Sequence, residues 1–405
     1  MAPIRRVAQL GSVLLVLAGV LGPVPAGSVP RGAEPPGGPT GGRTAAMAAR
    51  TAKTATAAAT AAAAKRAAEG PEDSRQLAGR RIVLSYPGPT PAPGVLQAIR
   101  EGRAAGVILF GENVTGPEQL AAAVAQLKQA AAEAPDPRPL LLMTDQEGGK
   151  VRRLPGAPEL SARGTGSAPS PLAAALDSGT AAAGTLTGAG LNVNLAPVLD
   201  VYDTPGNFID RFERSYGQDP TRVGELGSAF VAGQQSQGVA ATAKHFPGLG
   251  SAAREENTDA RPVTLPVPLG ELRTRGEAPY RAAIAAGVRL VMASWAVYPA
   301  LDPDRPAGFS STVIQGELRE RLGFDGVTVT DALEAEALTP YGPTGVRAVA
   351  AAAAGMDLIL CSARDPRQGE DATAALAAAL DAGGLDRSAF AESVDRVDAL
   401  RESLG

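Results

Sequence analysis

Short apolar runs recur along residues 77–405, separated by longer stretches in which alanine and leucine follow helical spacing. Eight runs are rich in β-branched and aliphatic side chains, a pattern typical of buried strands. They lie at residues 81–86, 106–110, 140–145, 191–198, 240–245, 290–294, 326–331 and 356–361. Helices are predicted between them, among them 117–132, 172–189, 221–237 and 312–322. For the last of these helices, Ser310 and Ser311 stand at the expected N-cap and Gly323 at the expected end.

The regular alternation of strand and helix predicts a parallel sheet, because each parallel pair of strands needs a crossover connection. Eight strand–helix units within residues 77–405 fit a closed barrel. An open doubly wound sheet is the alternative, but no Gly-x-Gly-x-x-Gly motif follows the first run, which disfavours its dinucleotide-binding form. The sequence therefore predicts an α/β fold consisting of a single (β/α)8 TIM barrel over residues 77–405.

The first 76 residues follow a different pattern. Arg5 and Arg6 precede an apolar segment at 7–21, and small residues follow up to Ala26, which predicts a signal peptide over 1–26. The apolar segment is shorter than the roughly 20 residues of a spanning helix, so we expect no stable membrane insertion after cleavage. Residues 30–76 contain no Val, Ile, Leu or aromatic residue, which predicts a low-complexity linker over 27–76. We expect a secreted, extracytoplasmic protein, with association with the cell wall as one destination.

Charge and composition exclude several classes of function. The chain has 38 Lys and Arg against 42 Asp and Glu, a net charge of −4, so a generally basic nucleic-acid binder is excluded. It has one cysteine, Cys361, and one histidine, His245, which exclude a disulfide framework, a thiolate cluster and a multi-histidine metal site. We therefore expect no metal and no cofactor, and a monomer.

Polar residues gather where the predicted strands end. Asp145 and Asp331 end the third and seventh runs, Asp200 follows the fourth, and Lys244 and His245 end the fifth. In a barrel of this class, the active site lies at the carboxyl ends of the strands. A carboxylate opposes burial unless the protein uses it, so these positions are the candidates for chemistry.

The motifs around these positions resemble those of glycoside hydrolase family 3, specifically the N-terminal barrel of its β-N-acetylhexosaminidase branch. The agreement covers most of residues 77–400 in order. Seven collinear motifs carry it: GVILFG from 106, DQEGGxVxR from 145, RSYG from 214, KHFPGxG from 244, PALD from 299, LGFDGV from 322 and TDxL from 330.

The resemblance implies a retaining glycosidase in which Asp331 is the nucleophile. It also implies that Asp145, Arg214, Lys244 and His245 hold the sugar hydroxyls of a carbohydrate substrate, a role that suits charge-assisted hydrogen bonds without a metal. The alternative for Asp331 is a cap on the following helix, and the alternative for His245 is a buried structural histidine. Lys244 and His245 are neighbours, so both can face one side of a strand only if it twists or bulges there.

Four further residues stay undecided between structural and functional roles. Glu147, Arg152 and Asp200 could each support the fold or the site. The aromatic ring of Trp295 could stack on a sugar or pack in the core.

One group expected from the resemblance is missing. The branch has an Asp-x-His acid/base dyad after the fifth strand, but here Asn257, Thr258 and Asp259 occupy those positions, in a loop about two residues longer. Asp259 is the first candidate for acid/base, with its pKa raised by burial and by Asp331, and Glu255 or Glu256 is the second.

Together with the predicted signal peptide, the resemblance implies a secreted hydrolase of β-linked N-acetylhexosaminides from peptidoglycan or chitin-type fragments. The alternative is a catalytically weak glycan-binding relative that lacks the dyad.

Overall fold

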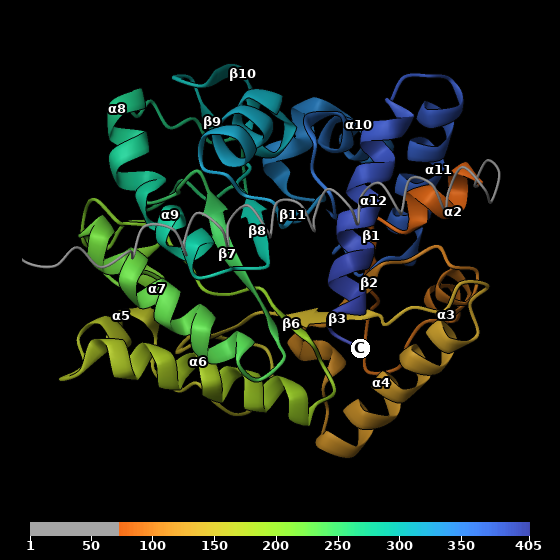
Figure 1. Cartoon of the computed structure of the whole chain (residues 1–405), viewed down its shortest axis with the longest axis horizontal. Helices are drawn as coiled ribbons and strands as arrows, with labels where there is room; N and C mark the ends of the chain where they lie inside the picture. Colours follow the sequence, from red (N-terminus) through yellow and green to blue (C-terminus); the bar gives the residue numbers. More distant parts are fainter. Residues whose placement is uncertain (1–72) are drawn as a thin grey trace, which may run out of the picture. The chain divides into compact units, whose positions relative to one another are not determined.

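The computed structural model describes residues 73–405 (Figure 1). The predicted signal peptide (1–26) and residues 27–72 of the predicted linker lie outside the described residues. The described part begins with helix α2 (Ser74–Gly79), whose N-cap Asp73 accepts a hydrogen bond from the backbone N–H of Arg75. Ser74, Arg75 and Gln76, which the composition assigned to the linker, belong to this helix.

Eight parallel strands form one sheet, in the order β11-β8-β7-β6-β3-β2-β1-β12. They are β1 (Ile82–Leu84), β2 (Gly106–Ile108), β3 (Leu141–Thr144), β6 (Val193–Asn194), β7 (Ala240–Phe246), β8 (Leu290–Ala293), β11 (Val327–Thr330) and β12 (Ile359–Leu360). A bridge between Val329 and Leu358 joins the two edge strands, so the sheet closes on itself. The predicted strands and the predicted barrel are confirmed.

The strands are buried on both faces, as expected for a parallel sheet covered by helices. Successive residues of one strand belong to different hydrophobic clusters: Leu141 and Met143 pack in one, and Leu142 in the other. The first cluster collects alternate residues from all eight strands, which places it in the barrel interior. The second lies between the strands and the outer helices.

The outer helices agree closely with the sequence pattern. The predicted helices correspond to α4 (Pro117–Ala132), α6 (Pro171–Gly188), α7 (Pro220–Gln235) and η5 (Thr312–Arg321), and α6 and α7 lie side by side (Figure 1). Helix η5 is wound with π rather than α geometry. Its N-cap residue is Ser311, whose side chain makes no capping hydrogen bond, while the backbone N–H of Val313 donates to Ser310 Oγ at 3.4 Å. Gly323 follows the end of the helix at a φ of 73°.

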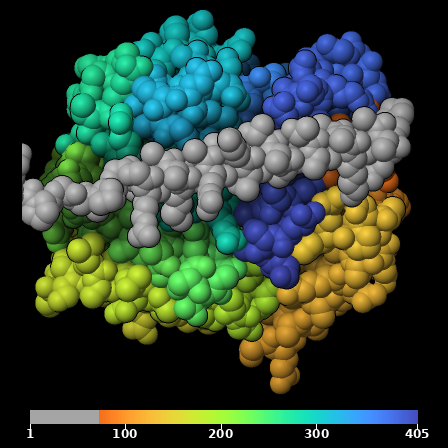
Figure 2. Space-filling model, in the orientation of Figure 1, coloured from red at the N-terminus to blue at the C-terminus, as the bar shows by residue number. Residues whose placement is uncertain are grey.

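Eight further helices of the described part have α or π geometry, and η6 (Glu336–Tyr341) is a 3-10 helix. The eight are α3 (Pro93–Arg100), α5 (Ala162–Gly166), α8 (Leu269–Glu271), η3 (Leu272–Gly276), α9 (Ala278–Ala285), α10 (Thr344–Ala354), α11 (Pro366–Asp381) and α12 (Arg387–Glu402). Figure 2 shows the C-terminal helices in blue beside the orange and yellow elements that begin the described part, in agreement with the pairing of β1 with β12. No helix within residues 73–405 is long and apolar enough to cross a membrane.

Candidate active site

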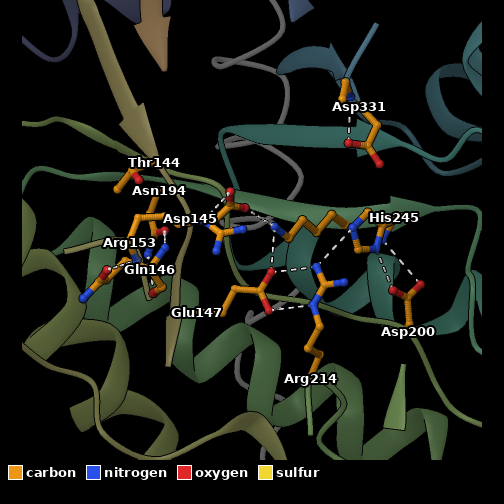
Figure 3. Close-up of polar contacts among 12 residues, drawn as sticks. Thr144, Asp145, Gln146, Glu147, Arg153, Asn194, Asp200, Arg214, His245 and Asp331 are labelled. Carbon is orange, nitrogen blue, oxygen red and sulfur yellow. Dashed lines mark hydrogen bonds and ion pairs between the residues drawn. The ribbon is translucent and has the colours of Figure 1, made fainter. Parts of the chain in front are cut away.

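The predicted site residues lie at the carboxyl ends of the strands. Asp145 directly follows β3, Asp331 directly follows β11, and Lys244 and His245 lie near the end of β7. Figure 3 shows Asp331 apart from the other labelled charged residues. Polar contacts link the others, with Lys244, into a row, which consists of Arg153, Asp145, Lys244, Glu147, Arg214, His245 and Asp200. The end of the barrel at which a fold of this class places its chemistry therefore carries these groups.

The row is held together by short polar contacts. The Nζ of Lys244 lies 2.7 Å from Asp145 Oδ1 and 2.8 Å from Glu147 Oε1. Arg214 donates two hydrogen bonds to the same Glu147 carboxylate, from Nη2 at 2.7 Å and from Nε at 2.9 Å. On its other side, Arg214 Nη2 lies 3.4 Å from His245 Nε2. The structure thus brings together all four residues that the resemblance assigns to the sugar.

The charges in this row stabilise one another. Burial disfavours the ionised form of Glu147, but Arg214 and Lys244 outweigh it and hold its pKa well below the usual range. Burial likewise opposes the charge on Lys244, but the Asp145 and Glu147 carboxylates raise its pKa above the ordinary value. Glu147, Lys244 and Arg214 are therefore all ionised at neutral pH.

Lys244 and His245 both join the row because strand β7 is irregular. The pairing of β7 with β8 shifts register between Ala243 and Phe246, and the Lys244–His245 peptide bond is cis. The predicted bulge is thus present, since a register shift of this kind re-aims adjacent side chains. Gly250 is the last residue of the KHFPGxG motif. A Cβ at this position would lie 1.9 Å from the Val201 carbonyl oxygen, which explains the need for glycine there.

Asp200, which the sequence left undecided, holds the histidine. Its Oδ2 lies 2.7 Å from His245 Nδ1, and its Oδ1 accepts the backbone N–H of Leu249 at 2.6 Å. The Asp200 side chain is fully buried. Nδ1 of His245 is therefore committed to Asp200, which leaves Nε2 for the Arg214 side of the site.

A small hairpin, β4 (Gln146–Gly148) with β5 (Val151–Arg152), carries Glu147 into the row. Gly148 turns the hairpin at a φ of 110°, where a Cβ would lie 2.2 Å from the Leu160 carbonyl oxygen. The buried Gln146 side chain accepts hydrogen bonds from the backbone N–H groups of Arg153 and Leu154. This hairpin thus fixes Glu147 relative to the strand ends.

The two arginines at the end of this motif make different contacts. Arg152 donates to the carbonyl oxygens of Gly149 and Gly156, so it supports the hairpin turn. Its neighbour Arg153 lies 3.8 Å from Asp145 Oδ2. The motif DQEGGxVxR, counted from Asp145, ends on Arg153. The spacing of the motif therefore identifies Arg153, rather than Arg152, as its last residue.

Asp331 is supported by a buried aromatic residue. Its Oδ1 accepts the backbone N–H of Ala332, and the Ala332 carbonyl oxygen accepts Trp295 Nε1 at 2.8 Å. Trp295 is only 1% exposed and packs against Phe309, so it belongs to the core and does not stack on a sugar. The N-cap residues of the next helices are Ala335 and Pro343, so Asp331 caps neither.

Asp259 lies in the loop after β7, and this loop contacts the segment after Asp331. The backbone N–H of Glu336 donates to the Asp259 carbonyl oxygen at 3.2 Å. Desolvation first and the Asp331 carboxylate second raise the pKa of Asp259 to about 6, against the opposing charges of His245 and Arg214. Asp259 is exposed to solvent, which screens the effects of desolvation and of the Asp331 charge. These two effects both raise the pKa of Asp259.

The two alternative carboxylates are placed differently. Glu255 is exposed and lies 3.9 Å from Arg254, and Glu256 accepts the backbone N–H of Ala253 at 2.6 Å. Neither is among the charges that shift the pKa of Asp259. In residues 73–405, no cluster of three or more His, Cys, Asp or Glu could hold a metal ion.

Comparisons with known proteins agree with this geometry. The sequence profile of the glycosyl hydrolase family 3 N terminal domain matches residues 84–400. The chain is 46% identical over 327 residues to an uncharacterized secreted glycosyl hydrolase of Arthroderma benhamiae, covering 81% of this chain and 93% of that protein.

Two solved structures have the same fold. A family 3 β-N-acetylglucosaminidase from Paenibacillus sp. superposes with a TM-score of 0.76 at 38% identity, over 81% of this chain and 62% of that one. A β-N-acetylhexosaminidase from Beutenbergia cavernae superposes with a TM-score of 0.75 at 35% identity, over 82% of this chain and 99% of that one. The chain therefore belongs to glycosyl hydrolase family 3 and is a glycosidase, the family that its strand-end motifs predicted.

Proposed function

We propose that this chain is a retaining β-N-acetylhexosaminidase that hydrolyses β-linked N-acetylhexosaminides, such as those in peptidoglycan or chitin fragments. The observation that carries the proposal is the row of charged side chains at the same barrel end as Asp331 (Figure 3). The names of the two solved relatives, a β-N-acetylglucosaminidase and a β-N-acetylhexosaminidase, support the substrate class.

In the proposed first step, the Asp331 carboxylate attacks the anomeric carbon while the bond to the leaving oxygen breaks. Asp259 gives its proton to that oxygen. In the second step, a water oxygen attacks the anomeric carbon, Asp259 takes the water proton, and the electron pair of the broken bond returns to Asp331.

The electrostatics of the two aspartates suit this cycle. After desolvation, the charge of Asp331 is the largest cause that raises the pKa of Asp259 to about 6. When Asp331 forms an ester with the sugar, that charge disappears and the pKa of Asp259 falls. Asp259 is thus protonated in a larger fraction of molecules before the glycosyl-enzyme forms, when it must donate, and deprotonated in a larger fraction afterwards, when it must accept the water proton.

The proposed sugar contacts use donors and acceptors that the protein leaves free. Asp145 keeps acceptor positions beside its contact to Lys244, and Lys244 keeps one ammonium proton beyond its two carboxylate contacts. Charge-assisted hydrogen bonds of this kind discriminate sugar hydroxyls by position.

A second candidate function is glycan binding with weak catalysis. The observation that favours it is the pairing of the chain's one histidine with Asp200, which leaves no histidine for the acid/base position.

One comparison separates the two functions. The full chain is assayed with 4-nitrophenyl β-N-acetylglucosaminide beside Asp331→Asn, and binding of N-acetylglucosamine is measured for both. We expect turnover in the unmutated chain, a loss of at least about 10³-fold in the variant, and binding retained in both. Binding without turnover in the unmutated chain would establish the binding function instead.

We also propose that the protein is exported, with a signal peptide over 1–26 and a linker over 27–76. The name of the Arthroderma benhamiae relative, a secreted glycosyl hydrolase, supports export. Recovery from the medium or envelope of a chain that begins near residue 27 is the expected result, and only full-length cytosolic protein would contradict it.

A further inference from the structure

Both oxygens of Glu147 are within 2.9 Å of cationic donors, whereas Asp145 has one such contact, to Lys244, and lies 3.8 Å from Arg153. Oε1 contacts Arg214 Nη2 and Lys244 Nζ, and Oε2 accepts Arg214 Nε. Its side chain is 6% exposed. Glu147 is therefore saturated by protein donors, unlike Asp145, and has little capacity left for a sugar.

We propose that Glu147 is a positioning residue: its carboxylate fixes Arg214 and Lys244 so that their remaining N–H donors face the substrate. The proposal rests on the proposed function, which gives those two cations their contacts with sugar hydroxyls. It adds a residue that sequence reasoning left undecided and that acts only through its neighbours.

The geometry fixes the direction of each cation. A bidentate contact along one edge of the planar Arg214 guanidinium sets the plane of the group. The Nη1 donors, on the far side from that edge, then have one orientation. Lys244 is fixed from two sides, by Asp145 at 2.7 Å and Glu147 at 2.8 Å, and its third proton points away from both.

The negative charge of Glu147 also helps to keep the buried Lys244 protonated. The Lys244 side chain is 2% exposed, and the charged groups around it are Asp145 after β3, Glu147 on β4 and Arg214 before α7. Without Glu147, only Asp145 would oppose both burial and the repulsion from Arg214. The pKa of Lys244 would then fall.

An amide at this position cannot replace the carboxylate. In Glu147→Gln, a single oxygen accepts, and the NH2 group faces either an Arg214 donor or the Lys244 ammonium. In Glu147→Asp, the charge stays but the shorter side chain cannot span both cations. The two variants therefore separate loss of charge from loss of reach.

The chain offers a direct readout of Lys244. It contains only five lysines, so 13C labelling of lysine gives few resonances to titrate; they are Lys53, Lys65, Lys128, Lys150 and Lys244. We expect the pKa of Lys244 to be the highest of the five in the unmutated full chain, and to fall by about one unit or more in Glu147→Gln.

A matched control exists in the outer layer. Glu317 on η5 is also a carboxylate between two arginines, Arg273 and Arg321, and its side chain is 7% exposed. Glu317→Gln makes the same chemical change away from the strand ends. We expect it to leave the Lys244 titration and the KM unchanged.

Kinetics complete the test. With 4-nitrophenyl β-N-acetylglucosaminide, Glu147→Gln should raise KM about 10- to 100-fold more than it lowers kcat, because the variant weakens binding and leaves the reacting carboxylates in place. Glu147→Asp should raise KM while Lys244 stays protonated, and it carries the test if Glu147→Gln does not fold.

An unmoved Lys244 titration in Glu147→Gln, or an unchanged KM in Glu147→Asp, overturns the positioning role. If Lys244 shifts as expected but the unmutated chain turns over no glycoside and binds no sugar, the proposed function fails and Glu147 still positions the two cations.

Discussion

At the scale of single residues, the central substitution is a carboxyl group where the family branch is expected to have an imidazole. A carboxyl group begins with a pKa near 4, too low for a general acid near neutrality unless its surroundings raise it. Desolvation and Asp331 raise the pKa of Asp259 to about 6. This shift has the direction that the proposed acid/base role of Asp259 requires.

This predicts a pH dependence that a carboxyl group sets. Since the acid must be protonated, kcat should fall as the pH rises through about 6. In Asp259→Ala, glycosides with poor leaving groups should lose far more activity than aryl glycosides, which need little protonation to depart. Added azide should partly restore release of the sugar from the enzyme.

Paired kinetics with aryl and alkyl β-N-acetylglucosaminides measure this asymmetry. Equal losses on both substrates, or none, would move the acid/base role to Glu255 or Glu256, and Glu255→Gln and Glu256→Gln then identify which. The exposed Glu255 is the control expected to change neither substrate.

At the scale of elements, the β4–β5 hairpin connects the fold to the site, because it carries Glu147 and leads to Arg153. Its turn depends on Gly148, which combines a φ of 110° with a backbone oxygen 2.2 Å from the position of a Cβ. Neither condition tolerates a side chain.

Gly148→Ala should therefore lower the free energy of unfolding by about 2–4 kcal/mol and raise KM, because the hairpin must move. Gly184→Ala in α6 is the matched control, since nothing lies within 4 Å of its Cβ position. There we expect a gain of about 0.5–1 kcal/mol and unchanged kinetics. Denaturant unfolding of both variants measures the difference, and equal stabilities would refute the role of the turn.

The elements also show how far the sequence alone could lead. Apolar runs and helical spacing predicted all eight barrel strands and four outer helices, because burial dictates those patterns. The hairpin and the register shift in β7 depend on backbone irregularity, which leaves no periodic signal. Asp200 stayed undecided because its partner His245 is 45 residues away in the chain.

At the scale of the whole molecule, the two ends of the barrel have different tasks. At the amino end, Asp357 pairs with Arg319 at 2.6 Å and with Arg396 of α12 at 2.9 Å, which ties the last helix to the strands. The carboxyl end carries the charged row and Asp331. This division is the one expected of a barrel that separates stability from function.

The central claim is that Asp331 forms a covalent bond with the sugar, and one measurement tests it most directly. The full chain is incubated with an aryl β-N-acetylglucosaminide fluorinated on the sugar ring, which slows hydrolysis of the intermediate, and is then analysed by mass spectrometry. We predict the added mass of one sugar, located on Asp331 by peptide mapping and absent from Asp331→Asn. A label on Asp259 or on any other residue, or no label while the chain releases the aryl alcohol, would contradict the account.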